Sequence, residues 1–249
     1  MRWTEKLKFA TAIALLCCAI PVLRAHEQSW YQVRPSPAAS PPATVSTSPA
    51  APQNELFVLL DPSHGGDDKG AVLGNHVLEK DVTLAFARAV RKELLDRGIA
   101  SRLLRDGDVT ISLERRAEAA NDPHVALYVA LHAGRRIRGM RVYMPVLPAT
   151  TRDPGSFLSW PAAQQVSLKR SESIARQVAK ELGKENLPAS VLAAPLRPLN
   201  NIVSPAVAVE ISPEQVGSGA LLNSDSERTP ASALAAAIAV SRNQWSLRQ

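Results

Sequence analysis

The segment from residue 55 onward alternates between short apolar runs and stretches in which apolar residues recur every three or four positions. Short apolar runs bounded by turn residues are typical of buried strands, and the wider spacing is typical of helices. The predicted strands cover residues 56–60, 99–104, 125–131, 140–144 and 206–211. This alternation predicts an α/β fold, here a single domain with a mostly parallel, twisted sheet of about five or six strands flanked by helices.

The clearest helical pattern covers residues 82–97, where Asp81 is a candidate N-cap and Gly98 is placed to end the helix. Its apolar stripe consists of Val82, Ala85, Phe86, Ala89, Val90 and Leu94. Three further helices are predicted: a short one after Ser112, one over residues 167–182 ended by Gly183, and an alanine-rich one over residues 231–239 that begins after Thr229 and Pro230.

Residues 1–25 have the pattern of an export signal. Three basic residues, Arg2, Lys6 and Lys8, precede an apolar stretch over residues 9–20. This stretch is shorter than the ~20 residues of a membrane-spanning helix, and Ala25 offers a small residue for cleavage. We therefore predict a signal peptide or short anchor at residues 1–25, export to the periplasm or cell envelope, and N-terminal membrane association if the segment stays uncleaved.

The following segment, residues 26–54, is rich in Pro, Ala, Ser and Thr. Most of it lacks the apolar periodicity that would let it pack against a core. Proline-rich chains of this kind are extended and stiff. We interpret residues 26–54 as a linker and residues 55–249 as the folded domain.

Composition and charge exclude several classes of function. Hydrophobic residues make up 45% of the 249-residue chain, which disfavours a disordered protein. Loss of residues 1–25 would remove four basic residues, one acidic residue and both cysteines, Cys17 and Cys18, and would lower the net charge from +6 to +3. So modest a charge, with 4% aromatic residues, gives no support to nucleic-acid binding. The absence of cysteine would remove thiolate catalysis and sulfur-ligated zinc.

Ionisable residues lie at or just beyond the carboxyl ends of three of the predicted strands. His64 comes shortly after the first strand, His132 directly follows the run at 125–131, and Glu210 lies near the end of the run at 206–211. The carboxyl ends of parallel strands share one edge of a sheet, where α/β folds bind ligands. Each histidine taken alone is equally well explained as a solvated or hydrogen-bonded loop residue, whereas the three positions together favour a site.

Glu79 lies just before the clearest helix and 15 residues after His64. With His64 and His132 it completes a set of two imidazoles and one carboxylate, and catalytic zinc commonly takes three such N/O ligands. Glu210 would then remain free to act as a base. The alternative for Glu79 is an acid that stabilises the helix N-terminus or forms a salt bridge without any metal.

Other candidates for the chemistry have less support. His76 is a further candidate ligand, but Gly74 and Asn75 before it favour a turn at the surface. The sequence contains neither the G-x-S-x-G elbow of serine hydrolases nor the G-x-x-x-x-G-K loop that binds phosphates. Four arginines, Arg135, Arg136, Arg138 and Arg141, follow His132 closely and form either a basic rim that attracts carboxylates or a solvated turn.

Six short blocks of the sequence follow one another in a recognisable order. They are LLDPSHGG at 59–66, LEKDV at 78–82, LRDGD at 104–108, Arg116 followed by Ala120-Asn121, LHA at 131–133, and Val209-Glu210. In this order and spacing they resemble the zinc-dependent N-acetylmuramoyl-L-alanine amidases, in the amidase_3 type of catalytic domain. The resemblance extends over roughly residues 56–245, which is essentially the whole predicted domain.

The resemblance implies a cell-wall hydrolase that cleaves the amide bond between N-acetylmuramic acid and L-alanine in peptidoglycan. It places His64, Glu79 and His132 on the family's zinc ligands and Glu210 on its catalytic glutamate. Arg197 matches an arginine that the family places near the substrate. The expected cofactor is therefore Zn²⁺ and the expected partner is peptidoglycan.

Two positions depart from the pattern of that family. Its catalytic glutamate usually leads into a Gly-Phe turn, whereas Glu210 is followed by Ile211 and Ser212, and an asparagine is common where this chain has Gly134. Both changes lie beside the predicted site. An alternative function therefore stands beside the first: a catalytically weak, amidase-like domain that binds peptidoglycan or regulates its turnover.

Overall fold

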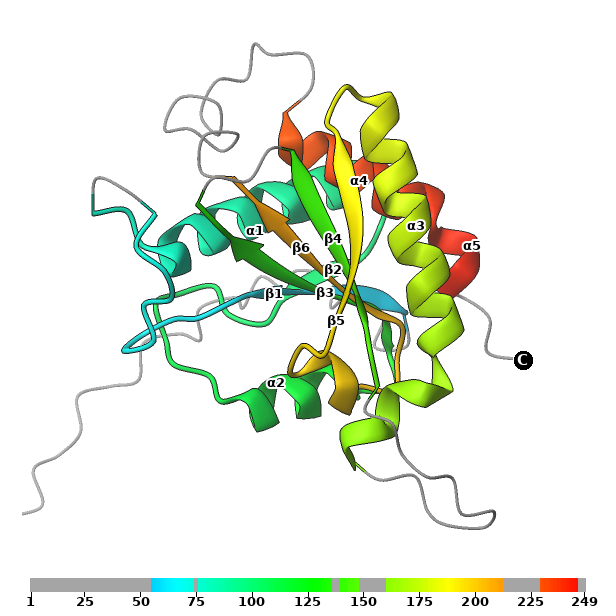
Figure 1. The fold of residues 1–249 in the computed structure, drawn as a ribbon, viewed down its shortest axis with the longest axis horizontal. Helices are drawn as coiled ribbons and strands as arrows, with labels where there is room; N and C mark the ends of the chain where they lie inside the picture. Colours follow the sequence, from blue (N-terminus) through cyan, green and yellow to red (C-terminus); the bar gives the residue numbers. More distant parts are fainter. Residues whose placement is uncertain (1–54, 74–75, 136–138, 148–159, 213–228, 246–249) are drawn as a thin grey trace, which may run out of the picture. The chain divides into compact units, whose positions relative to one another are not determined.

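The computed structural model describes residues 55–73, 76–135, 139–147, 160–212 and 229–245 (Figure 1). The predicted signal and linker, residues 1–25 and 26–54, lie outside the described residues. Within the described part of the chain, no helix is both long enough and apolar enough to cross a membrane.

A six-stranded sheet forms the centre of the fold, with the strand order β2-β1-β3-β6-β4-β5. The strands are β1 (Phe57–Pro62), β2 (Ser101–Leu103), β3 (Val125–Ala133), β4 (Met140–Pro145), β5 (Ala189–Ala194) and β6 (Ala206–Ile211). The first three strands and β6 run parallel, whereas β4 is antiparallel to β6 and parallel to β5. The predicted α/β fold with a mostly parallel sheet is confirmed.

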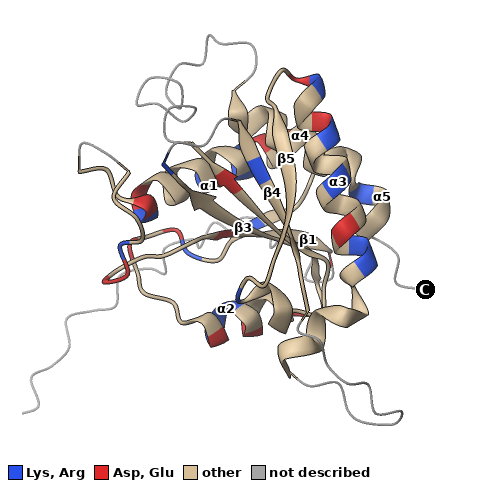
Figure 2. Ribbon diagram, viewed as in Figure 1, with Lys and Arg blue, Asp and Glu red and all other residues tan. Residues whose placement is uncertain are grey.

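Helices cover the two faces of this sheet unequally. One face carries α1 (Glu79–Asp96), α3 (Leu168–Lys184) and α4 (Pro230–Val240), and the four-residue α5 (Arg242–Trp245) follows α4. The opposite face carries α2 (Leu113–Ala120) and the 3₁₀ helix η2 (Leu199–Asn201), which contacts a second 3₁₀ helix, η1 (Trp160–Val166). Figure 1 shows α1, α4 and α3 along one side of the sheet and α2 on the other. Charged residues gather on helices and loops, and few lie on the strands (Figure 2).

Side chains along β3 point alternately to the two faces of the sheet. They divide the core into two layers and place His132 on the α2 face. Leu127, Val129 and Leu131 are fully buried against the α1, α3 and α4 layer. Tyr128 and Ala130 point to the α2 face and are also buried. His132 is the next residue in that second row, and 37% of its side chain is exposed. The α2 face is therefore sealed along the middle of β3 and open at its carboxyl end.

The structure corrects the predicted bounds of α1. The helix begins at Glu79, and Leu78 is its N-cap, so Asp81 lies inside the first turn and does not cap it. The early start follows from tertiary contacts, because the Glu79 amide donates to the carbonyl of Ala71 and the Lys80 amide to that of Lys69. These contacts lie outside the helix and leave no periodic signal in the sequence.

The buried face of α1 also differs in part from the predicted stripe. Phe86, Val90 and Leu94 are fully buried as expected, but Ala85 is exposed, and Thr83 and Ala87 are buried in its place. The central residues of each predicted helix and strand otherwise lie in a helix or strand of the structure. The strand β5 was not predicted from the sequence. It is only six residues long, none of its residues is buried, and a proline lies directly before and directly after it.

The end of α3 shows why Gly183 is not its terminator. The helix continues through Gly183 to Lys184, and Asn186 adopts a φ of 58° beyond its end. The amide of Leu187 then donates to the carbonyl of Leu182, and that of Asn186 to the carbonyl of Gly183. Asparagine is the residue that most often replaces glycine in this left-handed capping position.

Candidate metal centre

A strained turn directly after β1 carries the first candidate ligand. His64 has a φ of 65°, and Gly65 and Gly66 follow with φ values of 131° and 61°. A Cβ atom on Gly65 would lie 2.3 Å from the carbonyl oxygen of Val109, so only glycine fits there. A left-handed histidine costs about 1–3 kcal/mol and persists only where its surroundings hold it. The surrounding residues must therefore hold this turn.

Two buried arginines hold the turn in place. The Arg116 guanidinium, on α2, donates to the carbonyl of His64 at 2.8 Å and forms an ion pair with Asp61. The Arg105 guanidinium donates to the carbonyls of Ser63 at 3.1 Å and Lys80 at 2.8 Å. Arg105 thereby joins the turn of His64 to the first turn of α1. Both arginines are at least 95% buried, so few competing water contacts are available to them.

Asp61 balances the charge of Arg116 beneath this turn. Its carboxylate accepts hydrogen bonds from Arg116 and from the hydroxyl of Tyr128, which is fully buried. Burial raises the pKa of Asp61, while the positive charge of Arg116 and the hydrogen bond from Tyr128 oppose that rise. Removing one member of such a buried pair leaves the other charge unpaired, which is the costly outcome.

We expect Arg116→Met to lower the free energy of unfolding by about 3–5 kcal/mol, because it strands the Asp61 carboxylate in the core. Thermal and urea denaturation of the metal-free protein measure this loss. Arg115→Met on the same helix is the matched control, since Arg115 pairs with Glu118 at the surface and should be nearly neutral. Equal stability of the two variants would show that the buried pair does not hold the turn.

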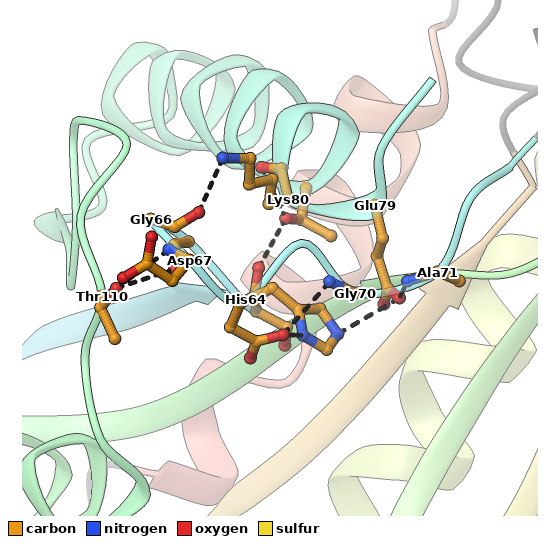
Figure 3. Close-up of polar contacts among 12 residues, drawn as sticks. His64, Gly66, Asp67, Gly70, Ala71, Glu79, Lys80 and Thr110 are labelled. Atoms are coloured by element: carbon orange, nitrogen blue, oxygen red, sulfur yellow. Dashed lines mark hydrogen bonds and ion pairs between the residues drawn. The ribbon is translucent and has the colours of Figure 1, made fainter. Parts of the chain in front are cut away.

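Three side chains from separate parts of the chain converge beside this turn. Glu79 projects from the first turn of α1 so that its Oε2 lies 3.2 Å from His64 Nε2 and its Oε1 lies 3.1 Å from His132 Nδ1. The ligand atoms of the three residues all lie within 4.8 Å of one another. Figure 3 shows Glu79 reaching from the helix toward the His64 ring, with Gly70 and Ala71 beside it.

The environment of Glu79 keeps its carboxylate ionised. Burial alone would raise its pKa, but hydrogen bonds with His132, His64 and the Ala71 amide outweigh burial and hold the pKa well below the usual range. The hydrogen bond to Glu79 also raises the pKa of His64, against the opposing effect of burial. The two imidazoles thus face an anionic carboxylate.

This donor set fits a zinc ion. Two imidazoles and one carboxylate are the N/O ligands of many catalytic zinc sites, in which a fourth position stays open. Only 8% of the Glu79 side chain is exposed, whereas 23% of the His64 side chain and 37% of the His132 side chain are exposed, so the group opens to solvent on the imidazole side. His64, Glu79 and His132 are the residues that would hold the metal.

Gly70 leaves the space in which this group is assembled. Its φ is 63°, and a Cβ atom there would lie 2.6 Å from Cδ2 of His64 and 2.8 Å from Oε2 of Glu79. We therefore expect Gly70→Ala to displace two candidate ligands and to weaken zinc binding sharply, as measured by competition with a chromophoric chelator. The matched control is Gly98→Ala, because Gly98 has a similar φ of 67° and nothing within 4 Å of the added atom. Equal zinc affinity in both variants would contradict the assignment.

Glu210 lies on the strand next to His132 and outside the three-residue group. The two residues are register partners in parallel strands, so their side chains project from the same face of the sheet. The antiparallel strand β4 places Arg141 opposite Glu210. The Tyr143 hydroxyl donates to Glu210 Oε2 at 2.6 Å, and an Arg141 nitrogen lies 3.4 Å from the same oxygen. Its carboxylate is thus held by two donors from β4.

The remaining predicted residues lie apart from this group. Arg197 is exposed and lines a cavity of about 670 Å³ together with Leu113, Val146 and Trp160. This cavity adjoins the carboxyl ends of β4 and β5, at the opposite end of the sheet from Glu210, because β4 is antiparallel to β6. His76 is exposed in a turn and is not part of the group.

The predicted arginine rim is described only in part. Arg136 and Arg138 lie outside the described residues, and Arg135 is exposed. Arg141 lies on β4, and its guanidinium contacts Glu210. The choice between a basic rim and a solvated turn therefore stays a prediction.

Besides the two arginines that hold the turn, four residues beside the candidate ligands and Glu210 had no role predicted from the sequence. They are Ser63, Asp68, Gly70 and Tyr143. Asp68 and Gly70 lie four and six residues after His64, so the run HGGDDKG could have drawn attention to them. Tyr143 reaches Glu210 only because β4 runs antiparallel to β6, and a sequence pattern does not reveal that direction.

The fold and this group of side chains define the class of the protein: an α/β domain with a candidate metal centre at the carboxyl ends of parallel strands. The chain belongs to the N-acetylmuramoyl-L-alanine amidase family, whose model matches residues 58–239. The predicted family is therefore confirmed, and the match covers both histidines, Glu79 and Glu210.

Curated relatives match parts of this chain. N-acetylmuramoyl-L-alanine amidase AmiA of Escherichia coli (strain K12) is 46% identical over 76 residues, which are 30% of this chain and 26% of the relative. AmiC of Escherichia coli O6:H1, with the same enzyme name, is 35% identical over 126 residues, which are 48% of this chain and 30% of the relative. The chain thus spans less than a third of the length of either relative.

Solved structures share the fold of this domain. N-acetylmuramoyl-L-alanine amidase AmiC2 of Nostoc punctiforme has a TM-score of 0.53 at 23% identity, covering 76% of this chain and 96% of that one. The amidase Ami1 of Mycobacterium smegmatis has a TM-score of 0.58 at 19% identity, covering 76% and 97%. At these identities the likeness concerns the fold alone.

Proposed function

We propose that this protein is a zinc-dependent N-acetylmuramoyl-L-alanine amidase, which hydrolyses the amide bond between N-acetylmuramic acid and L-alanine in peptidoglycan. The observation that carries the proposal is the convergence of His64, Glu79 and His132 within 4.8 Å, in a chain of this family. A bound zinc ion supplies Lewis acidity, which makes water more acidic and polarises a carbonyl group.

The residues around the group have separate tasks in this proposal. Glu210 accepts a proton from the water that attacks the lactyl carbonyl carbon, and it returns that proton to the amine of L-alanine as the C–N bond breaks. The products are a lactyl carboxylate on the sugar and a stem peptide with a free amino terminus. Tyr143 and Arg141 orient the Glu210 carboxylate through their hydrogen bonds.

Arg197 would contact the substrate away from the scissile bond. Peptidoglycan is an extended polymer, and an exposed guanidinium can pair with a stem-peptide carboxylate at a distance from the metal. We expect Arg197→Ala to raise KM for peptidoglycan and to leave kcat and zinc affinity unchanged, as measured by initial rates over a range of substrate concentrations. A fall in kcat at constant KM would remove Arg197 from the binding surface.

The proposal includes the cellular setting predicted from the N-terminal sequence. Residues 1–25 act as the export signal or short anchor, residues 26–54 tether the domain, and residues 55–249 carry the activity in the periplasm or cell envelope. Mass spectrometry of the N-terminus of the protein recovered from the envelope fraction tests this. An unprocessed chain confined to the cytoplasm would contradict the export proposal.

Removal and return of zinc test the proposed chemistry. Dialysis against a chelator should abolish peptide release from purified peptidoglycan, and about one equivalent of Zn²⁺ should restore it. A chelator-treated protein that retains full activity would refute zinc dependence. A zinc-loaded protein that binds peptidoglycan and releases no peptide would instead support the catalytically weak, wall-binding alternative.

A further inference from the structure

The two histidines of the candidate centre each bond to an outer partner through the ring nitrogen that faces away from Glu79. His64 Nδ1 lies 2.9 Å from Oδ1 of Asp68. His132 Nε2 lies 2.9 Å from the hydroxyl oxygen of Ser63. The nitrogens that face Glu79 are therefore Nε2 of His64 and Nδ1 of His132. The two imidazoles present opposite nitrogens to the same carboxylate.

The chemistry of the outer partners fits this difference. The carboxylate of Asp68 only accepts hydrogen bonds, so it holds the proton of neutral His64 on Nδ1 and leaves the lone pair on Nε2. The hydroxyl of Ser63 can accept as well as donate. It can accept a hydrogen bond from Nε2 of His132 when Nδ1 offers its lone pair to a metal, and it can donate to Nε2 when Nδ1 carries the proton.

We propose that Asp68 and Ser63 are positioning residues that fix the coordinating atoms of the zinc centre as Nε2 of His64 and Nδ1 of His132. This inference rests on the proposed zinc-dependent function. Outer-shell partners of metal-bound histidines set the tautomer and orientation of the ring. Asp68 also accepts a hydrogen bond from the Gly70 amide at 3.2 Å, so it anchors the loop that passes the group.

The same atoms could be read as a serine hydrolase relay, since Ser63, His132 and Glu79 are linked in that order. Two observations favour the positioning role. Ser63 is 6% exposed, which leaves little access for a substrate carbonyl. The Glu79 carboxylate contacts both imidazoles and accepts hydrogen bonds from the amides of Ala71 and Ala133. In a serine hydrolase relay the acid orients a single histidine.

Long-range ¹H–¹⁵N NMR of the full chain labelled with ¹⁵N-histidine tests the assignment directly. Addition of Zn²⁺ should shift Nε2 of His64 and Nδ1 of His132 to the metal-bound range and leave the other nitrogen of each ring protonated. Zinc-dependent shifts at the opposite nitrogens, or at the same nitrogen type in both rings, would overturn the inference while leaving the proposed function intact. A spectrum that zinc leaves unchanged would refute the proposed function itself, and the inference with it.

Variants separate positioning from a purely structural role. Asp68→Asn and Ser63→Ala should each weaken zinc affinity about 10–100-fold by chelator competition. Asp67→Asn removes the same charge one residue away and should leave zinc affinity unchanged. If the metal-free variants melted at a lower temperature but bound zinc as tightly as the wild type, both residues would have a purely structural role. Lost turnover in Ser63→Ala with unchanged zinc affinity would make Ser63 a nucleophile. Either result overturns the inference.

Discussion

Replacement of Glu210 by glutamine is expected to slow peptide release from peptidoglycan by about 10²–10⁴-fold while zinc stays bound. The substitution removes proton transfer and little else. The glutamine side chain has nearly the same size, and its oxygen can still accept the hydrogen bond that Tyr143 donates at 2.6 Å. Glu210 also lies outside the His64, Glu79 and His132 group, so the ligand set is preserved.

Two measurements made on the same preparation check this expectation. Zinc content should stay at about one ion per chain, and the rate of stem-peptide release should fall. Glu118→Gln, an exposed change on α2, serves as the control for loss of a carboxylate. Wild-type turnover by the Glu210 variant would remove the proton-transfer role from this residue, and loss of zinc would show that Glu210 supports the metal.

Replacement of Glu79 by glutamine is expected to abolish both zinc binding and hydrolysis. Its carboxylate is the anionic member of the candidate ligand set, and its pKa lies well below the usual range because the hydrogen bonds from His132 and His64 outweigh burial. Glutamine cannot supply that charge to a metal ion. Elemental analysis after dialysis should find about one zinc ion per wild-type chain and almost none in the variant.

Asp81→Asn distinguishes this role from a helix-terminal charge effect. Glu79 and Asp81 are both acids in the first turn of α1, where an anion stabilises the helix by interaction with its dipole. If that interaction were the purpose of Glu79, the two variants would lose similar stability and both would retain zinc. The metal assignment requires that only the Glu79 variant lose its zinc.

Much of the fold could be predicted because apolar residues recur along the chain with the spacing of buried strands and helices. The continuous apolar run in β3 and the stripe of Phe86, Val90 and Leu94 identify the elements that form the core. Bounds were less accurate where tertiary contacts set them. The start of α1 at Glu79 depends on hydrogen bonds to a preceding loop, and the exposed edge strand β5 has no strong pattern.

The candidate site, like the fold, could be predicted only in part. His64 follows β1, and His132 and Glu210 lie near the carboxyl ends of β3 and β6, so their common edge could be predicted from a parallel sheet. The residues that hold them could not. Arg105 acts through bonds to three main-chain carbonyls that are brought together only by folding, those of Pro62, Ser63 and Lys80. Carbonyl groups are common to every residue and therefore carry no sequence signal.

Mass spectrometry of peptidoglycan digested by the zinc-loaded protein tests the central proposal most directly. We expect free stem peptides that begin with the amino group of L-alanine, together with glycan chains of unchanged length that carry lactyl carboxylates. Cleavage between sugars, cleavage between amino acids of the stem, or no released product would contradict it.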